Sequence, residues 1–249
     1  MSVALLALLV AALTDAVPAP PPLLRYRAIL VQQQTIDLSS LDEGTQVTER
    51  RDTVYAQIAV QDSAGGHLVL IRIDSVAFQS ADLPEMPPDE IQRLRGATSQ
   101  FFFAPDGLAA RQTVLVEGGG IAAGIYAGLL DVVPRVRGTL AVGSSWSDSS
   151  ETIQLGDEDW RHSRFRTNYL VAPGRELRAA FAGSHARLNG TAEIRGTSTG
   201  TLRWMMGADR MPLDGARRET QTLLWKDDEL PAPLPLTIVN EVTIARLPG

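Results

Sequence analysis

Residues 53–78 read TVYAQIAVQDSAGGHLVLIRIDSVAF and predict an antiparallel β-hairpin. The alternating apolar positions are Val54, Ala56, Ile58 and Val60 before the turn, and Val69, Ile71 and Ile73 after it. Strict alternation is typical of a strand with one buried face, and the Asp-Ser-Ala-Gly-Gly segment between the two runs has turn composition. This segment therefore predicts that the chain folds as antiparallel β-structure.

The same kind of pattern continues in both directions from the hairpin. Further strands are expected over residues 25–38, 98–103, 111–117, 135–142, 151–155, 163–171, 176–182, 186–188, 191–196, 201–206, 217–225 and 236–247. Short strands separated by regular turn signals indicate a mainly β, antiparallel fold. Helix is expected only over residues 88–94, where proline and two acids begin the segment, and over residues 118–134.

The central helix carries a stripe of small residues. Gly120, Gly124 and Gly128 recur at every fourth position and so lie on one helix face. Each interior glycine disfavours the helix by about 0.5–1 kcal/mol relative to alanine, so a close approach to a sheet is expected to offset that loss. Pro134 ends the helix. The segment is interrupted by Asp131 and is too short for a transmembrane span, which needs about 20 apolar residues.

Two pairs of short motifs predict a tandem duplication. Thr53-x-Tyr55 matches Thr167-x-Tyr169, and Asp106-Gly107 matches Asp214-Gly215 at a similar offset. We therefore expect two antiparallel β halves, residues 20–117 and 135–249, connected by a glycine-striped helix over residues 118–134. The alternative is one long meander without internal symmetry.

The N-terminus predicts export. Residues 2–13 are almost wholly apolar and have the length of a signal-peptide core, and Val17 and Ala19 suit cleavage after residue 19. A buried N-terminal helix is the alternative, although no polar face is available for it. We expect residues 1–19 to be a signal peptide and the mature protein to be periplasmic or extracellular.

Composition excludes several classes of function. The 249-residue chain has a net charge of −6, 44% hydrophobic residues, 21% charged residues and no cysteine. A negative net charge argues against nucleic-acid binding, and the absence of cysteine excludes disulfides and thiolate chemistry. The length is sufficient to bury a sizeable core.

No catalytic, metal or cofactor site is predicted. His67, His162 and His185 have no second ligand at metal-binding spacing. Residues 196–200 (GTSTG) match the letters of a nucleophile elbow around Ser198, but the following residues predict a strand where an elbow needs a helix. The acidic segments 157–159 and 227–229 lack the spacing of a known calcium loop, so solvated charge is the favoured interpretation.

The centre of the chain resembles a family of exported bacterial proteins of unknown function. The residues that carry the resemblance are Val133-Pro134, Val136, Val142-Gly143-Ser144-Ser145-Trp146 and Thr167-x-Tyr169. The chain departs from the family pattern at Val133, where leucine is usual, and at Ser144, where aspartate is common. The resemblance implies export and a β-rich fold, and it implies no activity.

These observations lead to three functional hypotheses. The first is a non-enzymatic cell-envelope protein that binds a lipid or another hydrophobic ligand. Its expected wall residues are Phe101, Phe103, Trp146, Trp204 and Met206, for which ordinary core packing is the alternative. The second is a structural or interaction module of the envelope, with a protein partner and no small-molecule ligand. An enzyme of unrecognised class is the third.

Overall fold

All eleven strands that the structure describes belong to one antiparallel sheet, in the order β5-β4-β3-β2-β1-β11-β10-β9-β8-β7-β6. The structure is a computed structural model that describes residues 23–63, 66–81, 87–103, 110–112, 125–126, 128–130, 140–155 and 159–248. The predicted signal peptide, Gly120, Gly124 and Pro134 lie outside these residues. The mainly β, antiparallel prediction is confirmed.

The strands are long, and α-helix is scarce. The first half contains β1 (Leu24–Leu38), η1 (Ser39–Leu41), β2 (Gly44–Ser63), β3 (Gly66–Ser80), α1 (Pro88–Leu94), β4 (Thr98–Phe103) and β5 (Ala110–Gln112). The second half contains β6 (Ser145–Leu155), β7 (Asp159–Ala172), η2 (Pro173–Arg175), β8 (Glu176–Asn189), β9 (Ala192–Met206), β10 (Pro212–Lys226) and β11 (Leu234–Arg246). Residues 125–126 and 128–130 are helical.

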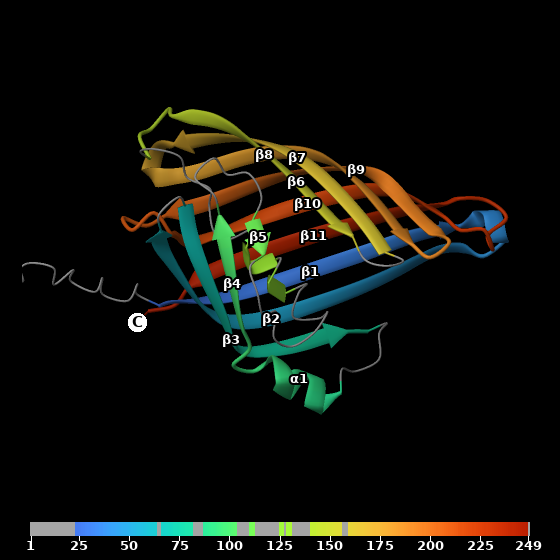
Figure 1. Ribbon diagram of the computed structural model, residues 1–249, viewed down its shortest axis with the longest axis horizontal. Coiled ribbons are helices and arrows are strands. Elements are labelled where there is room, and N and C mark those ends of the chain that lie inside the picture. The colour runs from blue at the N-terminus through green and yellow to red at the C-terminus, as the bar shows by residue number, and fades with distance from the viewer. Residues whose placement is uncertain are drawn as a thin grey trace, which may run out of the picture.

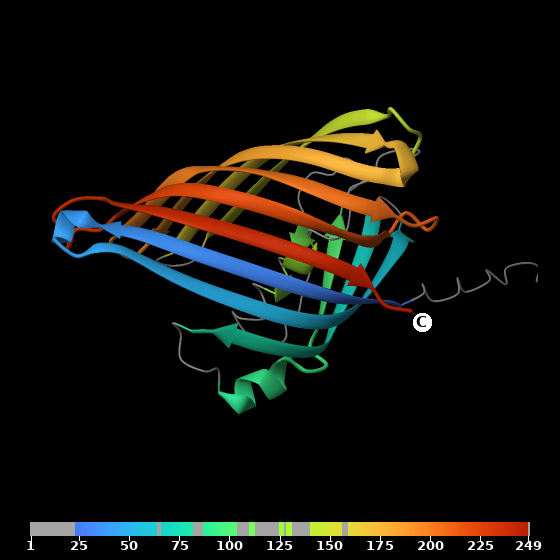
Figure 2. The ribbon, with the colours of Figure 1, turned by 180° about the vertical axis from the view of Figure 1, so that it is seen from behind.

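The first and last strands pair at the centre of the sheet. The β1–β11 ladder runs antiparallel from Tyr26 opposite Arg246 to Ile36 opposite Leu236. Figure 2 shows these two strands side by side in the middle of the outer face. Through this pairing, the strands before and after the central segment form one continuous sheet.

The sheet curls around the central helical segment (Figure 1). Ile125, Tyr126 and Leu129 are buried in one hydrophobic cluster with residues of β1–β4, β8, β9 and β11. A Cβ added at Gly128 would overlap Cδ2 of Leu30 on β1. At Gly128, the central helical segment therefore packs against the Leu30 side chain of β1.

Local sequence signals located several elements correctly. The predicted hairpin is β2–β3, which closes with Ser63 opposite Gly66. Helix α1 has a proline at its N-terminus and acids in its first turn, and Gly96 follows it with a positive φ of 80°. Residues 44–51 lie outside the strands predicted from the sequence, but they form the first part of β2.

Glycine misled the prediction of strand ends in the second half. Gly183 falls between the predicted strands 176–182 and 186–188 but lies inside β8. Residues 197–200 fall between the predicted strands 191–196 and 201–206 but lie inside β9. A Cβ at Gly200 would overlap the Phe181 ring and the Arg218 carbonyl oxygen. This glycine accommodates an aromatic ring from the neighbouring strand and does not end a strand.

The two Thr-x-Tyr anchors of the predicted duplication face opposite sides of the sheet. Tyr55 is exposed on the outer face of β2, whereas Tyr169 packs against the core. The Tyr169 ring stacks on Trp146 with centroids 5.0 Å apart. Trp146 lies outside the strands predicted from the sequence, but it is within β6 and opposes Tyr169 in register.

The contact between Gly128 and Leu30 gives a test of the packing. Gly128→Leu should lower the free energy of unfolding by about 1–3 kcal/mol, because the added side chain overfills the space above β1. Urea unfolding of wild-type protein, Gly128→Leu, Leu30→Ala and the double variant measures this effect. Gly128→Leu should be less destabilising in the Leu30→Ala background, and equal losses in both backgrounds would contradict the contact.

Candidate functional site

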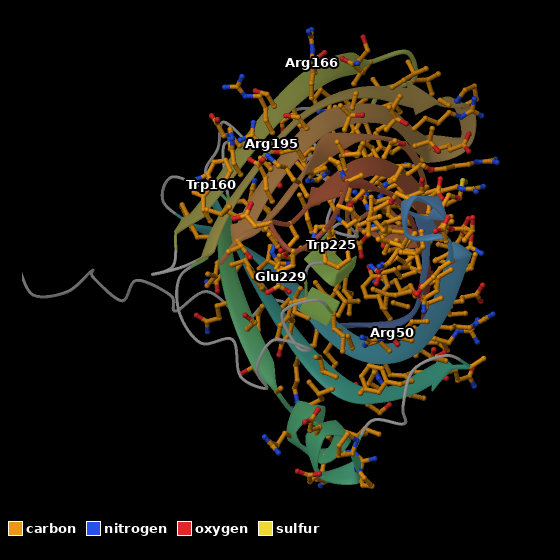
Figure 3. The ribbon with its side chains drawn as sticks, turned by 90° about the vertical axis from the view of Figure 1, so that its right-hand side faces the viewer. Arg50, Trp160, Arg166, Arg195, Trp225 and Glu229 are labelled. Atoms are coloured by element: carbon orange, nitrogen blue, oxygen red, sulfur yellow. The ribbon has the colours of Figure 1, made fainter. Side chains whose placement is uncertain are left out.

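The two faces of the sheet differ in chemistry. Side chains on the outer, convex face are largely exposed and form ion pairs across neighbouring strands, such as Arg218 Nε with Glu241 Oε1 at 3.2 Å. Exposed pairs of this kind contribute about 0–1 kcal/mol to stability and mainly keep the face solvated. Figure 3 shows Arg166 extending from the outer side, whereas Trp225 lies within the curve. Most of the buried polar and charged side chains therefore lie on the concave face.

One half of the concave face is filled by core residues. Tyr26, Trp204 and Leu177 are 0% exposed and belong to the same cluster as Ile125 and Leu129. We call this region the filled half. Close packing by side chains of the same chain accounts for this part of the concave face.

A band of polar side chains crosses the concave face beyond the filled half. We call it the polar belt, and it consists of Arg50 and Asp52 on β2, Gln32 on β1, Asn240 on β11, Arg217, Glu219 and Gln221 on β10, Ser198 on β9, His185 on β8 and Ser163 on β7. Glu219, Asn240, Gln32 and Arg50 are consecutive register partners. Antiparallel register places such partners on the same face, so the belt is a continuous feature of the sheet.

Two arginine–carboxylate pairs neutralise most of the charge in the belt. Arg50 Nε donates to Asp52 Oδ1 at 2.8 Å, and Arg217 Nη2 donates to Glu219 Oε2 at 2.9 Å. In each pair the partners are two residues apart on one strand, so both side chains project from the same face. The Arg217 guanidinium also lies 4.6 Å from the centre of the Phe181 ring.

The two carboxylates of the belt, Asp52 and Glu219, have opposite electrostatic environments. Burial raises the pKa of Asp52, and the bond from Arg50 offsets this effect only in part. Burial also raises the pKa of Glu219, but His185, Arg217 and Gln221 together outweigh burial and lower that pKa to about 2. Glu219 is therefore ionised throughout the neutral and mildly acidic range, and it anchors the surrounding donors.

Ser198 and His185 lie in contact within the belt. His185 Nε2 is 3.1 Å from Ser198 Oγ and 3.7 Å from Glu219 Oε1, and His185 Nδ1 is 3.0 Å from Ser163 Oγ. Ser198 is buried in the middle of β9, where the backbone pairs with β8 and β10. A nucleophile elbow needs a strand-to-helix turn with free N–H groups beside the serine, and β9 does not provide one there. The arrangement fits a satisfied polar network.

An apolar zone follows the belt at the end of the sheet that carries η1. We call it the apolar rim, and it consists of Ile36 and Leu38 on β1, Ile194 on β9, Leu223 and Trp225 on β10, and Leu234, Leu236 and Ile238 on β11. Leu223, Leu234 and Leu236 are buried but lie outside the main core cluster. Trp225, Ile36 and Ile238 are half-buried. The belt therefore separates two apolar zones.

The residues that we expected to form a ligand wall lie in the filled half. Phe101, Phe103, Trp204 and Met206 are buried in the core cluster, and Trp146 packs against it. The Phe101 and Tyr126 ring centroids are 6.1 Å apart, so the central helical segment contacts this wall directly. These residues do share one face, but ligand binding by them stays a prediction.

The sequence analysis did not identify the belt or the rim as a site. Arg50-x-Asp52 and Arg217-x-Glu219 place opposite charges two residues apart in alternating strands, which is a detectable signal. His185 lies between two predicted strands, 176–182 and 186–188, but it is within β8 and belongs to the belt. His67 and His162 lie elsewhere in the sheet, and His162 contacts Glu151 at 2.7 Å.

Comparisons with known proteins return no relative. No protein-family model matches the chain, and no curated protein sequence matches it. The resemblance to exported bacterial proteins therefore stays a prediction. Within the described ranges, the structure has no helix long and apolar enough to cross a membrane and no cluster of three or more potential metal ligands.

The buried state of Glu219 predicts a pH dependence of stability. Folding lowers the pKa of Glu219 from an ordinary value of 4.5 to about 2. A depressed pKa stabilises the fold above the unfolded value, so this contribution, about 3 kcal/mol, is lost as pH falls from about 5 to about 2. Glu219→Gln should therefore be less stable than wild type at neutral pH, and the difference should shrink in acid.

Urea unfolding at a series of pH values measures this difference. Glu241→Gln is the matched control, because Glu241 faces outward on β11 and forms a surface pair with Arg218. The control should differ from wild type by about 0.5 kcal/mol or less at every pH. A constant gap between Glu219→Gln and wild type down to acid pH would contradict the assigned role of Glu219.

Proposed function

We propose that the protein binds a hydrophobic ligand against the apolar rim and has no catalytic role. The observation that carries this proposal is the position of the rim: it is apolar and concave-facing, and the polar belt separates it from the filled half. If the concave face served only as a core, apolar residues in place of the belt would make the fold as stable or more stable. Buried ion pairs are often no more stabilising than apolar residues of similar volume. Retaining the belt and a second apolar zone favours a binding role.

The dimensions of the rim suit an alkyl chain. Its residues lie on β9, β10, β11 and β1, which are adjacent strands. Four adjacent strands extend over about 14 Å across a sheet. Ile194 opposes Trp225, and Trp225 opposes Leu234, so apolar side chains line this direction without a break. A linear apolar ligand lying across the strands would contact most of them.

The arrangement of the belt favours ligand binding over catalysis. Its arginines are already paired with Asp52 and Glu219, and Ser198 contacts His185 within a regular β9 backbone. Catalysis by a serine requires preorganised donors for a developing oxyanion, and backbone N–H groups that are bonded within a sheet are not available for that role. The belt also provides a polar boundary that would stop an apolar ligand at a defined depth.

We further propose that the protein works outside the cytoplasm. The support comes from residues 1–19, whose apolar segment and small residues before position 20 fit a signal peptide. A structural or interaction module of the envelope is the second candidate, and the position of β6 at one edge of the sheet favours it. An edge strand offers backbone groups to which a partner strand can pair.

The tandem duplication is a hypothesis about the origin of the chain. The duplication is compatible with the topology, because antiparallel strands lie both before and after the central segment and belong to one sheet. The opposite orientations of Tyr55 and Tyr169 weaken the first pair of anchors, and Asp106 and Gly107 lie outside the described residues. A single meander that never contained two equivalent halves remains the competing hypothesis.

Native mass spectrometry of protein purified from its expressing cells tests the proposed function. Wild-type protein should retain a co-purifying lipid or other apolar molecule, and Trp225→Ala should lose most of it because the largest rim side chain is removed. Trp160→Ala is the matched control, since Trp160 is half-buried on the outer face of β7, with its ring 5.9 Å from that of His162.

Three results would decide between the candidates. Ligand retained by wild type and the Trp160 variant, but lost by the Trp225 variant, supports the rim. Equal loss in both tryptophan variants would point to damaged folding, which circular dichroism and urea unfolding would reveal. No bound ligand in any form, together with no binding of an added fluorescent fatty-acid analogue, would overturn the proposal and favour the interaction module.

A further inference from the structure

Two hydrogen-bond donors, one beside the rim and one within it, lack acceptors among the described residues. Arg187 Nε on β8 and Trp225 Nε1 on β10 are buried, and neither meets an acceptor among the described residues. Buried polar atoms are normally paired, because an unsatisfied buried group destabilises a fold by about 1–3 kcal/mol. Two such donors at the same end of one face call for an explanation.

The register places both donors on the concave face and close together. Arg187 opposes Ile194 on β9, and Ile194 opposes Trp225 on β10. The two donors are therefore two strands apart in one row, which corresponds to about 10 Å between their backbones. Arginine and tryptophan side chains are long enough to converge over the intervening Ile194.

Three carboxylates that the structure describes in this part of the sheet are engaged elsewhere. Asp227 follows β10, and its Oδ1 accepts from Thr191 Oγ1 at 3.4 Å and from the Glu229 N–H at 3.1 Å. Glu193 pairs with Arg195, which is largely exposed on the outer face. Glu219 is held within the belt by Arg217 and Gln221. None of these carboxylates has a described contact with Arg187.

We infer that Arg187 and Trp225 bind the anionic group of an amphipathic ligand whose apolar part lies on the rim. Arginine presents planar donors that match a carboxylate or phosphate, and an indole N–H adds a donor that cannot act as an acceptor. The inference rests on the proposed function, because the rim supplies the contact area for the rest of the ligand. It adds the charge of the ligand and the place where that charge is bound.

The arrangement also gives the ligand an orientation. Its anionic group lies over β8 to β10, at Arg187 and Trp225, and its apolar chain extends across β10, β11 and β1 towards Leu236 and Ile36. A cationic amphiphile of the same length would leave the donors unpaired and would place like charges together. A neutral amphiphile would gain only the apolar contacts.

Isothermal titration with three probes that share one alkyl chain tests the inference. The probes are dodecanoate, dodecanol and dodecyltrimethylammonium, each below its aggregation concentration and above neutral pH. Wild-type protein should bind dodecanoate at least about tenfold more tightly than dodecanol, since a hydrogen bond to a charged group is worth about 1.5–3 kcal/mol. The cationic probe should bind most weakly. Dodecyl phosphate, used as a fourth probe, distinguishes a phosphate headgroup from a carboxylate.

Two conservative variants test the donors separately. Arg187→Gln removes the charge, and Trp225→Phe keeps an aromatic ring but removes the N–H. Each should reduce the preference for dodecanoate over dodecanol, measured as the ratio of the two affinities in the same variant, by about threefold or more. Arg195→Gln, on the outer face of the neighbouring strand, should leave the preference unchanged. Circular dichroism confirms that each variant is folded.

The outcomes separate this inference from the proposed function. Binding of dodecanoate and dodecanol with equal affinity would overturn the anionic site and leave the hydrophobic site standing. A preference for the anion that survives in both variants would overturn the assignment to Arg187 and Trp225. Failure of every probe to bind would overturn the proposed function, and the inference with it.

Discussion

The pairing of β1 with β11 is the constraint on which the rest of the structure depends. It joins residues about 200 positions apart in the chain, from Tyr26 opposite Arg246 to Ile36 opposite Leu236. Bringing such distant segments together has an entropic cost that local contacts do not carry, and the cost must be offset by the full ladder and its buried side chains. Ala28 and Ile244 oppose each other in that ladder and are both buried in the core. Without it, β1 and β11 would each be an open edge of a separate sheet.

Curvature then creates two unlike faces. Gly200 and Gly183 accept the rings of Phe181 and Phe165 from neighbouring strands, and a Cβ at either glycine would overlap both a ring and a backbone carbonyl. Glycine positions of this kind allow a sheet to bend sharply while an aromatic ring fills the inner space. The outer face is left to exposed ion pairs, and the inner face receives the core, the polar belt and the apolar rim. Any binding function consequently depends on this bend.

The polar belt divides the concave face into the filled half and the apolar rim. Glu219 and Asp52 are both buried beside an arginine two residues away, yet their pKa values shift in opposite directions because Glu219 has two further polar neighbours. A belt with this much internal pairing is a fixed boundary between the filled half and the rim. The central helical segment packs on one side of that boundary, where Gly128 meets Leu30. Arg187 and Trp225 lie on the other side of the boundary, and each has a hydrogen-bond donor that meets no acceptor among the described residues.

The sequence by itself determined the antiparallel β class, the β2–β3 hairpin and helix α1, because alternation, turn composition and helix-start signals act over a few residues. It also marked Gly128 as a position of close approach. Only the tertiary structure decided that one sheet holds all the described strands, that Gly183 and Gly200 lie within strands, and that Tyr55 and Tyr169 face opposite sides. It alone assembled the belt and the rim. The physical reason is register: each face is chosen by pairing with a distant strand, and a shift by one residue would exchange the two faces.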